Sequence, residues 1–239
     1  MSKHGKRYNS ATSLIDRESQ YTTDQAVVKV KATATSKFDE SIELHLRTSA
    51  DPRHADQQVR GVASLPNGNG KTVKITVFAQ GEGVSIAQSA GADYIGDDDL
   101  IKKIEGGWAE FDVSIATPDM MGKVSKLGKV LGRKGLMPNP KTGTVVAPDD
   151  IERAVNEARK GRVEFKLDKT SIIHVVVGKA SFEEQQLVEN ISSVVDHIVR
   201  ARPSGVKGDF IHSAYLTSTM GPSVPLNISG LSEIRGNEL

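Results

Sequence analysis

The sequence predicts two domains, an α/β domain inserted between the two halves of an α+β domain. The first observation is length, because 239 residues, 37% of them hydrophobic and 26% charged, suffice for two hydrophobic cores. The second is Pro-Asn-Gly-Asn-Gly at 66–70, a turn cluster that marks a domain boundary. The third is the surrounding pattern: strands and helices alternate after residue 70, whereas strands near the two chain ends need one another as sheet partners.

The N-terminal part begins with a capping box. Thr22 and Gln25 stand three residues apart, where a helix is expected to start and run to about residue 35. Apolar side chains then alternate along 41–47, the pattern of a strand with one buried face. A second strand is expected at 59–65.

The segment 67–159 has short apolar runs separated by helical patterns, a spacing typical of a parallel sheet covered by helices. We expect strands at 73–79, 94–95 and 111–116, and helices at 82–90, 97–104, 123–131 and 149–160. Together they predict a three-layer, Rossmann-like α/β domain.

The C-terminal part returns to strands. A tight polar turn at 168–170 separates apolar runs at 162–167 and 171–177, which predicts a hairpin. A capping box at 181–184 opens a helix with one apolar face, 210–219 is the last strand, and 228–239 is expected to be a loose tail. Because strand 41–47 can pair with the hairpin and the last strand, residues 1–66 and 160–239 are expected to form one discontinuous α+β domain of split β-α-β type.

Residues 120–148 contain six basic side chains and no acid, although the formal net charge of the chain is only +1. A local excess of this kind predicts a polyanionic partner. The six residues, called here the basic patch, are Lys123, Lys126, Lys129, Arg133, Lys134 and Lys141.

Several classes of function are disfavoured. There is no cysteine for a disulfide or a thiolate zinc site, and no apolar run long enough for a membrane span, so a cytoplasmic protein without membrane contact is expected. The pair Gly81 and Gly83 begins like a dinucleotide-binding turn, but Ile86 occupies the third small position. Residues 128–134 lack the P-loop pattern, and 97–99 (Asp-Asp-Asp) suits a helix N-terminus better than a metal. We therefore expect no catalytic residues, no cofactor and no metal.

Two segments combine the residue types that contact ribose hydroxyls and base edges in folded RNA. Lys37, Phe38 and Glu43 supply a cation, a ring and a carboxylate around the first strand. The segment 217–223 ends the last strand with hydroxyls, a thioether and a glycine that permits close backbone approach. Each feature taken alone is also common at turns and strand ends.

Four further segments follow one another along the chain: 37–40 (KFDE), 51–53 (DPR), 126–144 (KLGKVLGRKGLMPNPKTGT) and 218–221 (STMG). Together they resemble the bacterial form of the universal L-one family of large-subunit ribosomal proteins. The resemblance implies a non-enzymatic part of the 50S subunit, monomeric when free, that binds the mobile stalk of large-subunit rRNA near the tRNA exit site and assists release of deacylated tRNA. It also implies binding to the mRNA of its own operon and repression of its translation. Arg133 stands where the family usually has proline.

Matched by position, the resemblance implies an rRNA site on both strand regions and, more weakly, at the hairpin. Phe38 and Met220 would pack against ribose and base, and Glu43 would accept a hydrogen bond from RNA or orient Lys37. The implied residues are Lys37, Phe38, Glu43, Lys169, Thr170, Ser213, Thr217, Thr219, Met220 and Gly221. The basic patch would make secondary contacts, among them contacts with tRNA, or pack internally.

Two alternatives remain open. A nonspecific RNA chaperone would bind through its lysines alone, with a steep dependence on salt. A nucleotide-binding α/β enzyme would use the segment 67–159.

Overall fold

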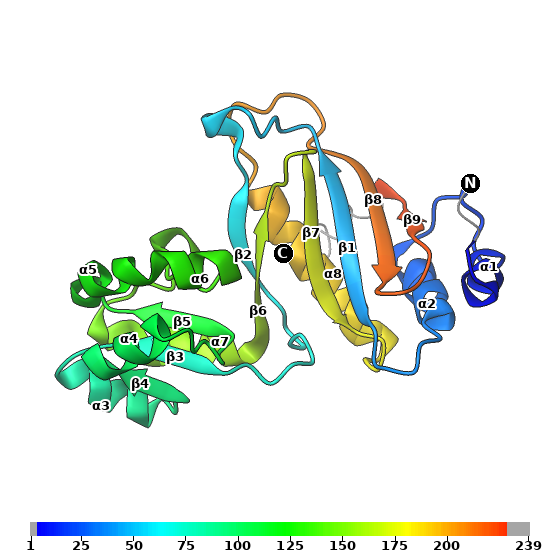
Figure 1. Cartoon of the computed structure of the whole chain (residues 1–239). Helices are drawn as coiled ribbons and strands as arrows, with labels where there is room; N and C mark the ends of the chain where they lie inside the picture. The colour runs from blue at the N-terminus through cyan, green and yellow to red at the C-terminus, as the bar shows by residue number, and fades with distance from the viewer. Residues whose placement is uncertain (1–3, 229–239) are drawn as a thin grey trace. The chain divides into compact units, whose positions relative to one another are not determined.

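The computed structural model describes residues 4–228 of the chain (Figure 1). It divides into two compact units, Met1–Gly70 with Val163–Leu239, and Lys71–Arg162, which we call the discontinuous unit and the inserted unit. Their limits differ by a few residues from the expected boundaries after 66 and before 160. Most of the expected tail, from 229 onward, lies outside the described residues.

The discontinuous unit contains a four-stranded sheet in the order β7-β1-β8-β9, with all neighbours antiparallel. The predicted partners of the first strand are therefore confirmed, whereas α1 and β9 were not anticipated. The helices are α1 (Lys6–Thr12), α2 (Thr23–Thr33), η1 (Ala55–Gln57) and α8 (Glu184–Arg200). The strands are β1 (Ser41–Thr48), β2 (Arg60–Ser64), β6 (Arg162–Lys166, whose first residue belongs to the inserted unit), β7 (Ile172–Lys179), β8 (Ile211–Ser218) and β9 (Val224–Leu226).

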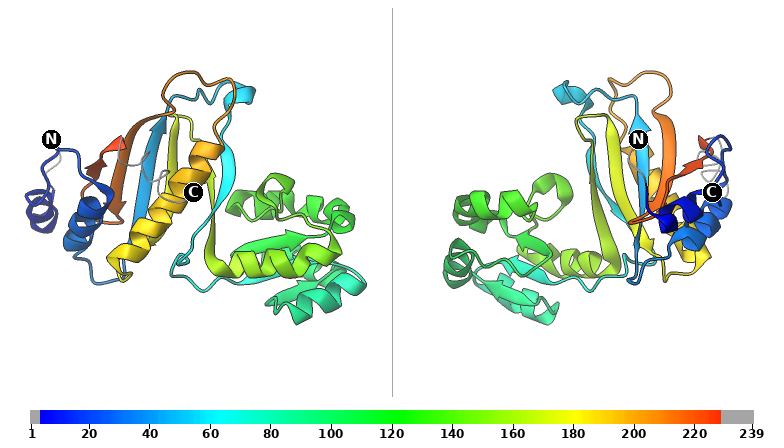
Figure 2. Two further views of the ribbon diagram at one scale, coloured as in Figure 1. Left: turned by 180° about the vertical axis from the view of Figure 1, so that it is seen from behind. Right: turned by 45° about the vertical axis from the view of Figure 1, so that its right-hand side comes forward.

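One face of this sheet is covered by α2 and α8 (Figures 1 and 2). The alternation of β1 directs Ile42, Leu44 and Leu46 into the core, where the apolar face of α8 meets them. The predicted capping box of α2 is present, with the Thr22 side chain accepting from the Gln25 amide and the Gln25 side chain accepting from the Thr22 amide. Within residues 4–228, no helix of this unit covers the opposite face of the sheet, which holds the site described below.

Two expectations for this unit were wrong. The strand at 162–167 does not form a regular hairpin with the next strand, because β6 pairs with β2 and only a Leu167–Ile173 bridge joins it to β7. Phe165 explains part of this pairing, because its ring lies directly against Gly61 of β2. A Cβ added at Gly61 would come within 2.7 Å of the Phe165 ring. Helix α8 begins at 184 with a box formed by Glu183 and Gln186, and not at 181–184.

The inserted unit has a parallel sheet in the order β4-β3-β5 with a helical layer on each face, so the three-layer prediction is confirmed. Helices α4, α5 and α6 pack on one face, and α3 and α7 on the other. The elements are β3 (Ile75–Phe78), α3 (Glu82–Ser89), β4 (Tyr94–Gly96), α4 (Asp98–Glu105), β5 (Val113–Ala116), η2 (Pro118–Met120), α5 (Met121–Val124), η3 (Ser125–Leu127), α6 (Gly128–Lys134), η4 (Pro140–Thr142), η5 (Pro148–Asp150) and α7 (Ile151–Gly161).

The helix expected at 123–131 is broken into two short helices by the 3₁₀ turn at Ser125–Leu127. Helix α6 ends where Gly135 takes a left-handed conformation with φ 71°. Arg133 lies in the last turn of α6, where a cation is favoured by the helix dipole. Position 133, where the resemblance implies proline, is thus helical in this chain.

Candidate nucleic-acid interface

The start of β1 and the end of β8 form one structural unit. The Thr219 hydroxyl accepts from the Ser41 amide at 3.0 Å and lies 3.2 Å from the Ser41 carbonyl, to which it donates. The Thr219 amide also donates to that carbonyl, at 3.0 Å. Thr219 is one of the residues expected in the rRNA site, but its hydroxyl is already engaged, so its visible task is to join the two strand ends.

The loops at these strand ends expose apolar side chains. Phe38, before β1, is 54% exposed, and Met220, after β8, is 51% exposed. Lys37 is exposed beside Phe38. Exposed apolar side chains on neighbouring loops, with the cationic side chain of Lys37 beside them, are suited to contact ribose and base surfaces.

Gly221 is required by packing against the protein itself. A Cβ at this position would overlap the Oγ of Ser218, which is buried. Thr217, half-buried on β8, donates its hydroxyl to the Ser218 carbonyl at 3.0 Å. The close approach expected of this glycine therefore serves the turn that presents Met220.

Glu40 was missed by the sequence analysis as a site residue. It is 1% exposed, and its two carboxylate oxygens accept hydrogen bonds from Ser36 and Met220, one from each loop. Burial alone would raise the pKa of Glu40, but the N–H groups of Met220 and Ser36 hold it below its usual value. Nothing in the local pattern distinguishes this acid from its exposed neighbour Asp39, because its main partner lies 180 residues away.

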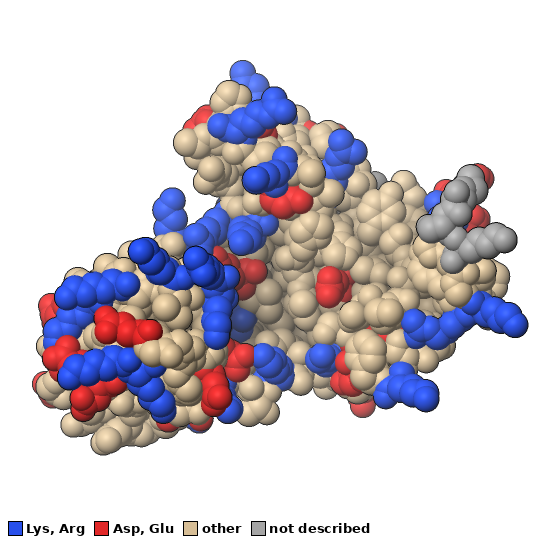
Figure 3. Space-filling model, viewed as in Figure 1, with Lys and Arg blue, Asp and Glu red and all other residues tan. Residues whose placement is uncertain are grey.

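The uncovered face of the sheet carries three rows of side chains across β7, β1 and β8. Glu43 lies in register with Val176 and Thr217, and Arg47 with Ile172 and Ser213. Between them, His45 lies in register with His174 and Tyr215. The central part of this face shows mostly uncharged residues (Figure 3).

The two histidines of the central row are in direct contact. Their Nδ1 atoms are 2.8 Å apart, so one ring must be a donor and the other an acceptor, and the rings meet edge to face. Burial, and next the neighbouring His174, lower the pKa of His45, while the carboxylate of Glu43 acts in the opposite direction. His45 is therefore expected to be neutral at pH 7.

Three predicted residues, Lys169, Thr170 and Ser213, lie at the other end of the sheet. Lys169 and Thr170 are exposed in the turn before β7, and the adjoining Ser171 carbonyl accepts from the Thr48 amide at the end of β1. Ser213 is across β1 from β7 at this same end. With a rise of about 3.3 Å per residue, Glu43 and Arg47 are about 13 Å apart along β1. The ten predicted residues thus form two groups, one at each end of an uncovered face.

Asp168 organises the turn that precedes β7. Its carboxylate accepts from the Thr170 hydroxyl at 2.6 Å and from the Thr170 and Ile172 amides, each at 2.8 Å. Burial would raise the pKa of Asp168, but these hydrogen bonds and the nearby His174 lower it to about 2. The turn therefore presents Lys169 on a fixed backbone, although the Thr170 hydroxyl is engaged by Asp168.

The basic patch lies on the inserted unit, and Figure 3 shows Lys and Arg gathered over α5 and α6. Lys126, Lys129 and Arg133 are exposed and spaced three and four residues apart on this nearly continuous helical segment, so they share one face. Lys123 is bound to Asp98 of α4 at 2.7 Å, which raises the pKa of Lys123. Its charge is compensated within the protein.

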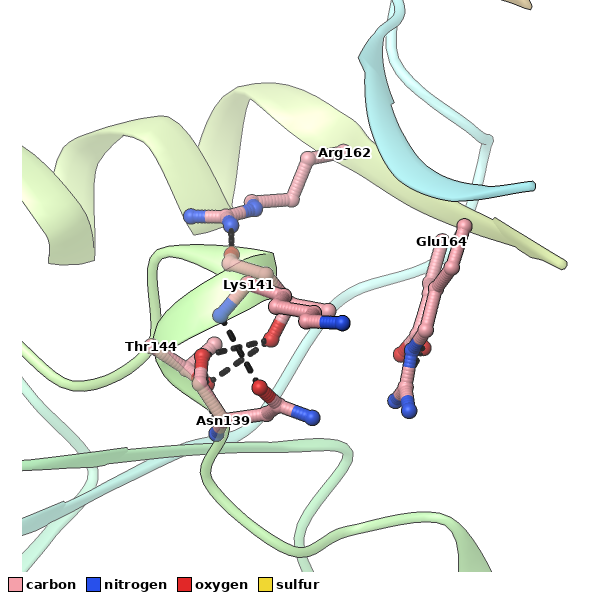
Figure 4. Close-up of polar contacts among 7 residues, drawn as sticks. Asn139, Lys141, Thr144, Arg162 and Glu164 are labelled. Atoms are coloured by element: carbon pink, nitrogen blue, oxygen red, sulfur yellow. Dashed lines mark hydrogen bonds and ion pairs between the residues drawn. The ribbon is translucent and has the colours of Figure 1, made fainter. Parts of the chain in front are cut away.

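Lys141 belongs to a rigid loop of the inserted unit (Figure 4). The Asn139 side chain accepts from the Lys141 amide at 2.9 Å, and Thr144 Oγ1 accepts from the Asn139 amide at 2.8 Å. Arg162 donates to the carbonyl of Thr142 in the same loop. Glu164, also labelled in this view, forms its own ion pair with Arg60 between β6 and β2. Internal contacts thus account for the conformation of this loop.

The described residues, 4–228, contain no cluster of three or more histidine and acidic side chains able to hold a metal ion. Within the same range, no helix combines the length and apolar character needed to cross a bilayer.

Comparison with known proteins identifies the family. A model of the ribosomal protein L1p/L10e family matches residues 30–222. The chain belongs to this family. It is 56% identical over 236 residues to large ribosomal subunit protein uL1 of Dehalococcoides mccartyi strain BAV1, covering 99% of this chain and 100% of the relative.

Two other relatives with the same name support this assignment. The protein of Thermomicrobium roseum is 54% identical over 230 residues, covering 96% of this chain and 95% of the relative. The protein of Chloroflexus aggregans is 52% identical over 236 residues, covering 98% of this chain and 100% of the relative. The family resemblance stated from the sequence is thus confirmed: the chain is a non-enzymatic ribosomal protein of the large subunit.

Proposed function

We propose that this protein binds the mobile stalk of large-subunit rRNA, near the tRNA exit site, through the uncovered sheet face of its discontinuous unit. There it assists release of deacylated tRNA. By binding a similar RNA fold in the mRNA of its own operon, it also represses translation of that operon. In this proposal the protein is a monomer when free and acts in the ribosome of the cytoplasm.

The observation that supports this proposal most directly is the pair of strand-end loops. Phe38 and Met220 are more than half exposed, yet their backbones are tied together through Ser41, Thr219 and Glu40. Exposed apolar groups on a fixed backbone lose little conformational freedom when they bind, which favours recognition of a defined RNA shape.

The proposal assigns different tasks to the two units. The discontinuous unit recognises the stalk, and the basic patch of the inserted unit adds contacts to phosphates, including those of tRNA. Lys126, Lys129 and Arg133 suit such contacts because they are exposed on one helical face. The second group of predicted residues, Lys169, Thr170 and Ser213, extends the main site to the far end of the sheet.

Binding of the full chain to a stalk fragment at increasing salt tests this proposal. The control is an RNA of equal length and composition that cannot form the stalk fold. We expect a large preference for the stalk fragment that persists at high salt, because shape-dependent contacts are less sensitive to salt than lysine-phosphate contacts. An operon-leader mRNA fragment should compete for the same site. Equal affinity for both RNAs at every salt concentration would support the nonspecific chaperone instead.

A footprint on rRNA, read with cleavage reagents attached to each unit in turn, tests the division of tasks. Reagent attached at Asp39, an exposed residue of the discontinuous unit beside Phe38, should cut within the stalk. If strong stalk cleavage came only from reagent on the inserted unit, the assignment of the main site would be wrong.

A further inference from the structure

A buried carboxylate, that of Glu40, joins the two loops of the proposed RNA site in addition to the bonds between Ser41 and Thr219. Glu40 Oε1 accepts from the Ser36 amide at 2.9 Å, and Glu40 Oε2 accepts from the Met220 amide at 2.9 Å. The first bond fixes the loop that carries Lys37 and Phe38, and the second fixes the loop that carries Met220 and Gly221. A single side chain therefore connects segments from opposite ends of the sequence.

Glu40 is itself held in place from the sheet. Its carbonyl accepts from the Ala180 amide at 2.8 Å, just beyond the end of β7, and the next residue, Ser41, begins β1. The carboxylate thus extends from a fixed backbone to two loops that lack regular structure of their own.

The chemistry of these bonds favours a positioning role over a general contribution to packing. A buried charge is costly unless hydrogen bonds compensate it, and at Glu40 the two bonds from amide N–H groups supply this compensation. Bonds from amides to a carboxylate are shorter and stronger than neutral ones, and each oxygen serves a different loop. An apolar residue would fill this space without joining the loops.

We propose that Glu40 is a positioning residue that holds the Phe38 and Met220 loops in the conformation that binds RNA. The inference rests on the proposed function. Glu40 does not touch RNA in this arrangement. It lowers the cost of binding, because loops fixed in advance lose less conformational freedom when the RNA docks.

The decisive variant is Glu40→Gln, which keeps the size of the side chain but replaces one acceptor oxygen by an NH₂ group. That group cannot accept from an N–H, so one loop must lose its bond. The matched control is Asp39→Asn. Asp39 is the neighbouring acid and also accepts two hydrogen bonds, from the Ser181 amide at 3.1 Å and the Ser181 hydroxyl at 2.8 Å, but it is exposed and does not reach the 219–221 loop.

The experiment measures the stalk-fragment affinity of the full chain for five proteins: wild type, Glu40→Gln, Asp39→Asn, the double variant Phe38→Ala/Met220→Ala, and Glu40→Gln in that double-alanine background. We expect Glu40→Gln to weaken binding by roughly 5- to 50-fold and Asp39→Asn by less than about twofold, the scale of losing one buried charged hydrogen bond against an exposed one. In the double-alanine background, the effect of Glu40→Gln should fall below about threefold, because the side chains that it positions are gone.

Amide hydrogen exchange supplies an independent measurement. In Glu40→Gln, the amides of Ser36 or Met220 should lose protection while the core amides of β1 keep theirs. If Glu40→Gln does not fold, Glu40→Asp retains the charge but is one methylene too short to reach both loops, and the same results are expected of it.

The proposal is overturned if Glu40→Gln loses amide protection but binds as wild type, or if its cost is equal in both backgrounds. The proposed function itself fails separately, when the double-alanine protein binds as tightly as wild type.

Discussion

The basic patch and the strand ends of β1 and β8 make an instructive contrast. The basic patch holds six cations and no acid within 120–148, and it dominates the charge pattern of the sequence. The strand ends show no excess of basic residues, but Ser41, Thr219 and Glu40 connect them through hydrogen bonds whose partners come from opposite ends of the chain. Charge is simple to detect in a sequence, whereas organisation of this kind becomes visible only after folding.

The difference bears on specificity. Lysines on an exposed helical face attract any phosphate backbone, and their contribution decreases as salt rises. A pair of exposed apolar side chains on a fixed backbone can instead distinguish one RNA surface from another. We therefore expect the strand ends to determine which RNA is bound, and the basic patch to affect how rapidly and at what salt it is bound.

The largest expected effect is that of Met220→Asp on stalk binding. A carboxylate at this half-exposed position would face RNA phosphates and would remove an apolar contact, so we expect a loss of about 1–3 kcal/mol, roughly 5- to 150-fold in affinity. Titration calorimetry with a stalk fragment would measure it. Val28→Asp is the matched control, since Val28 is 46% exposed on α2 and lies outside the proposed site. Equal losses in the two variants would indicate a nonspecific effect of charge.

The next effect compares glycines from the two regions. A Cβ at Gly221 would overlap the buried Ser218 Oγ, so Gly221→Ala should destabilise the protein by about 1–3 kcal/mol and weaken stalk binding. Gly128→Ala places the same methyl in α6, where nothing lies within 4 Å, and should be neutral or stabilising by about 0.5–1 kcal/mol. Urea denaturation of both variants would measure the difference. If Gly221→Ala were as stable as wild type, the turn would have to rearrange at little cost to accommodate the added methyl group.

A smaller effect is expected from neutralising the basic patch. Replacing Lys126, Lys129 and Arg133 by alanine should change stalk affinity by less than about threefold at physiological salt while lowering the salt slope by up to about 2. Lys123 should be left intact, because its ion pair with Asp98 makes it a structural residue. If this triple variant lost more affinity than Met220→Asp, the roles assigned to the two regions would have to be exchanged.

Much of the fold follows from the sequence because alternation and capping are local. The buried side chains Ile42, Leu44 and Leu46 and the capping box of Thr22 and Gln25 are as expected. The pairing of β6 was not predictable in the same way. It depends on Phe165 lying against Gly61, a contact between residues about a hundred positions apart.

The site shows the same limit. The residue types at 37–43 and 217–221 indicated RNA contact, and the structure places these segments together through the register of β1 with β8. The partners of the threonine hydroxyls could not be foreseen, because the Thr219 hydroxyl bonds to Ser41 and the Thr170 hydroxyl bonds to Asp168 within the protein. The role of Glu40 and the contact of His45 with His174 were missed because their partners come from distant segments of the chain.

The smallest effect concerns pH and the centre of the sheet face, between the two groups of predicted residues. His45 faces His174 on β7 and Tyr215 on β8, with Glu43 along its own strand. Because burial and His174 lower the pKa of His45 in the folded protein, the unfolded chain binds its proton more readily. Stability should therefore be lost as pH falls from the unfolded value, near 6.5, through the folded pKa, and it should be unaffected above this window.

Replacing His45 by glutamine removes this titration while retaining a polar side chain beside His174. Between pH 7.5 and 5.5, the wild type should lose more stability than His45→Gln, by under about 1 kcal/mol, as measured by urea denaturation at each pH. The reverse sign would mean that Glu43 outweighs burial and stabilises a charged His45. In that case the sheet face would carry a positive charge between its two polar ends, and the phosphate backbone of the RNA would have an attractive contact there as well.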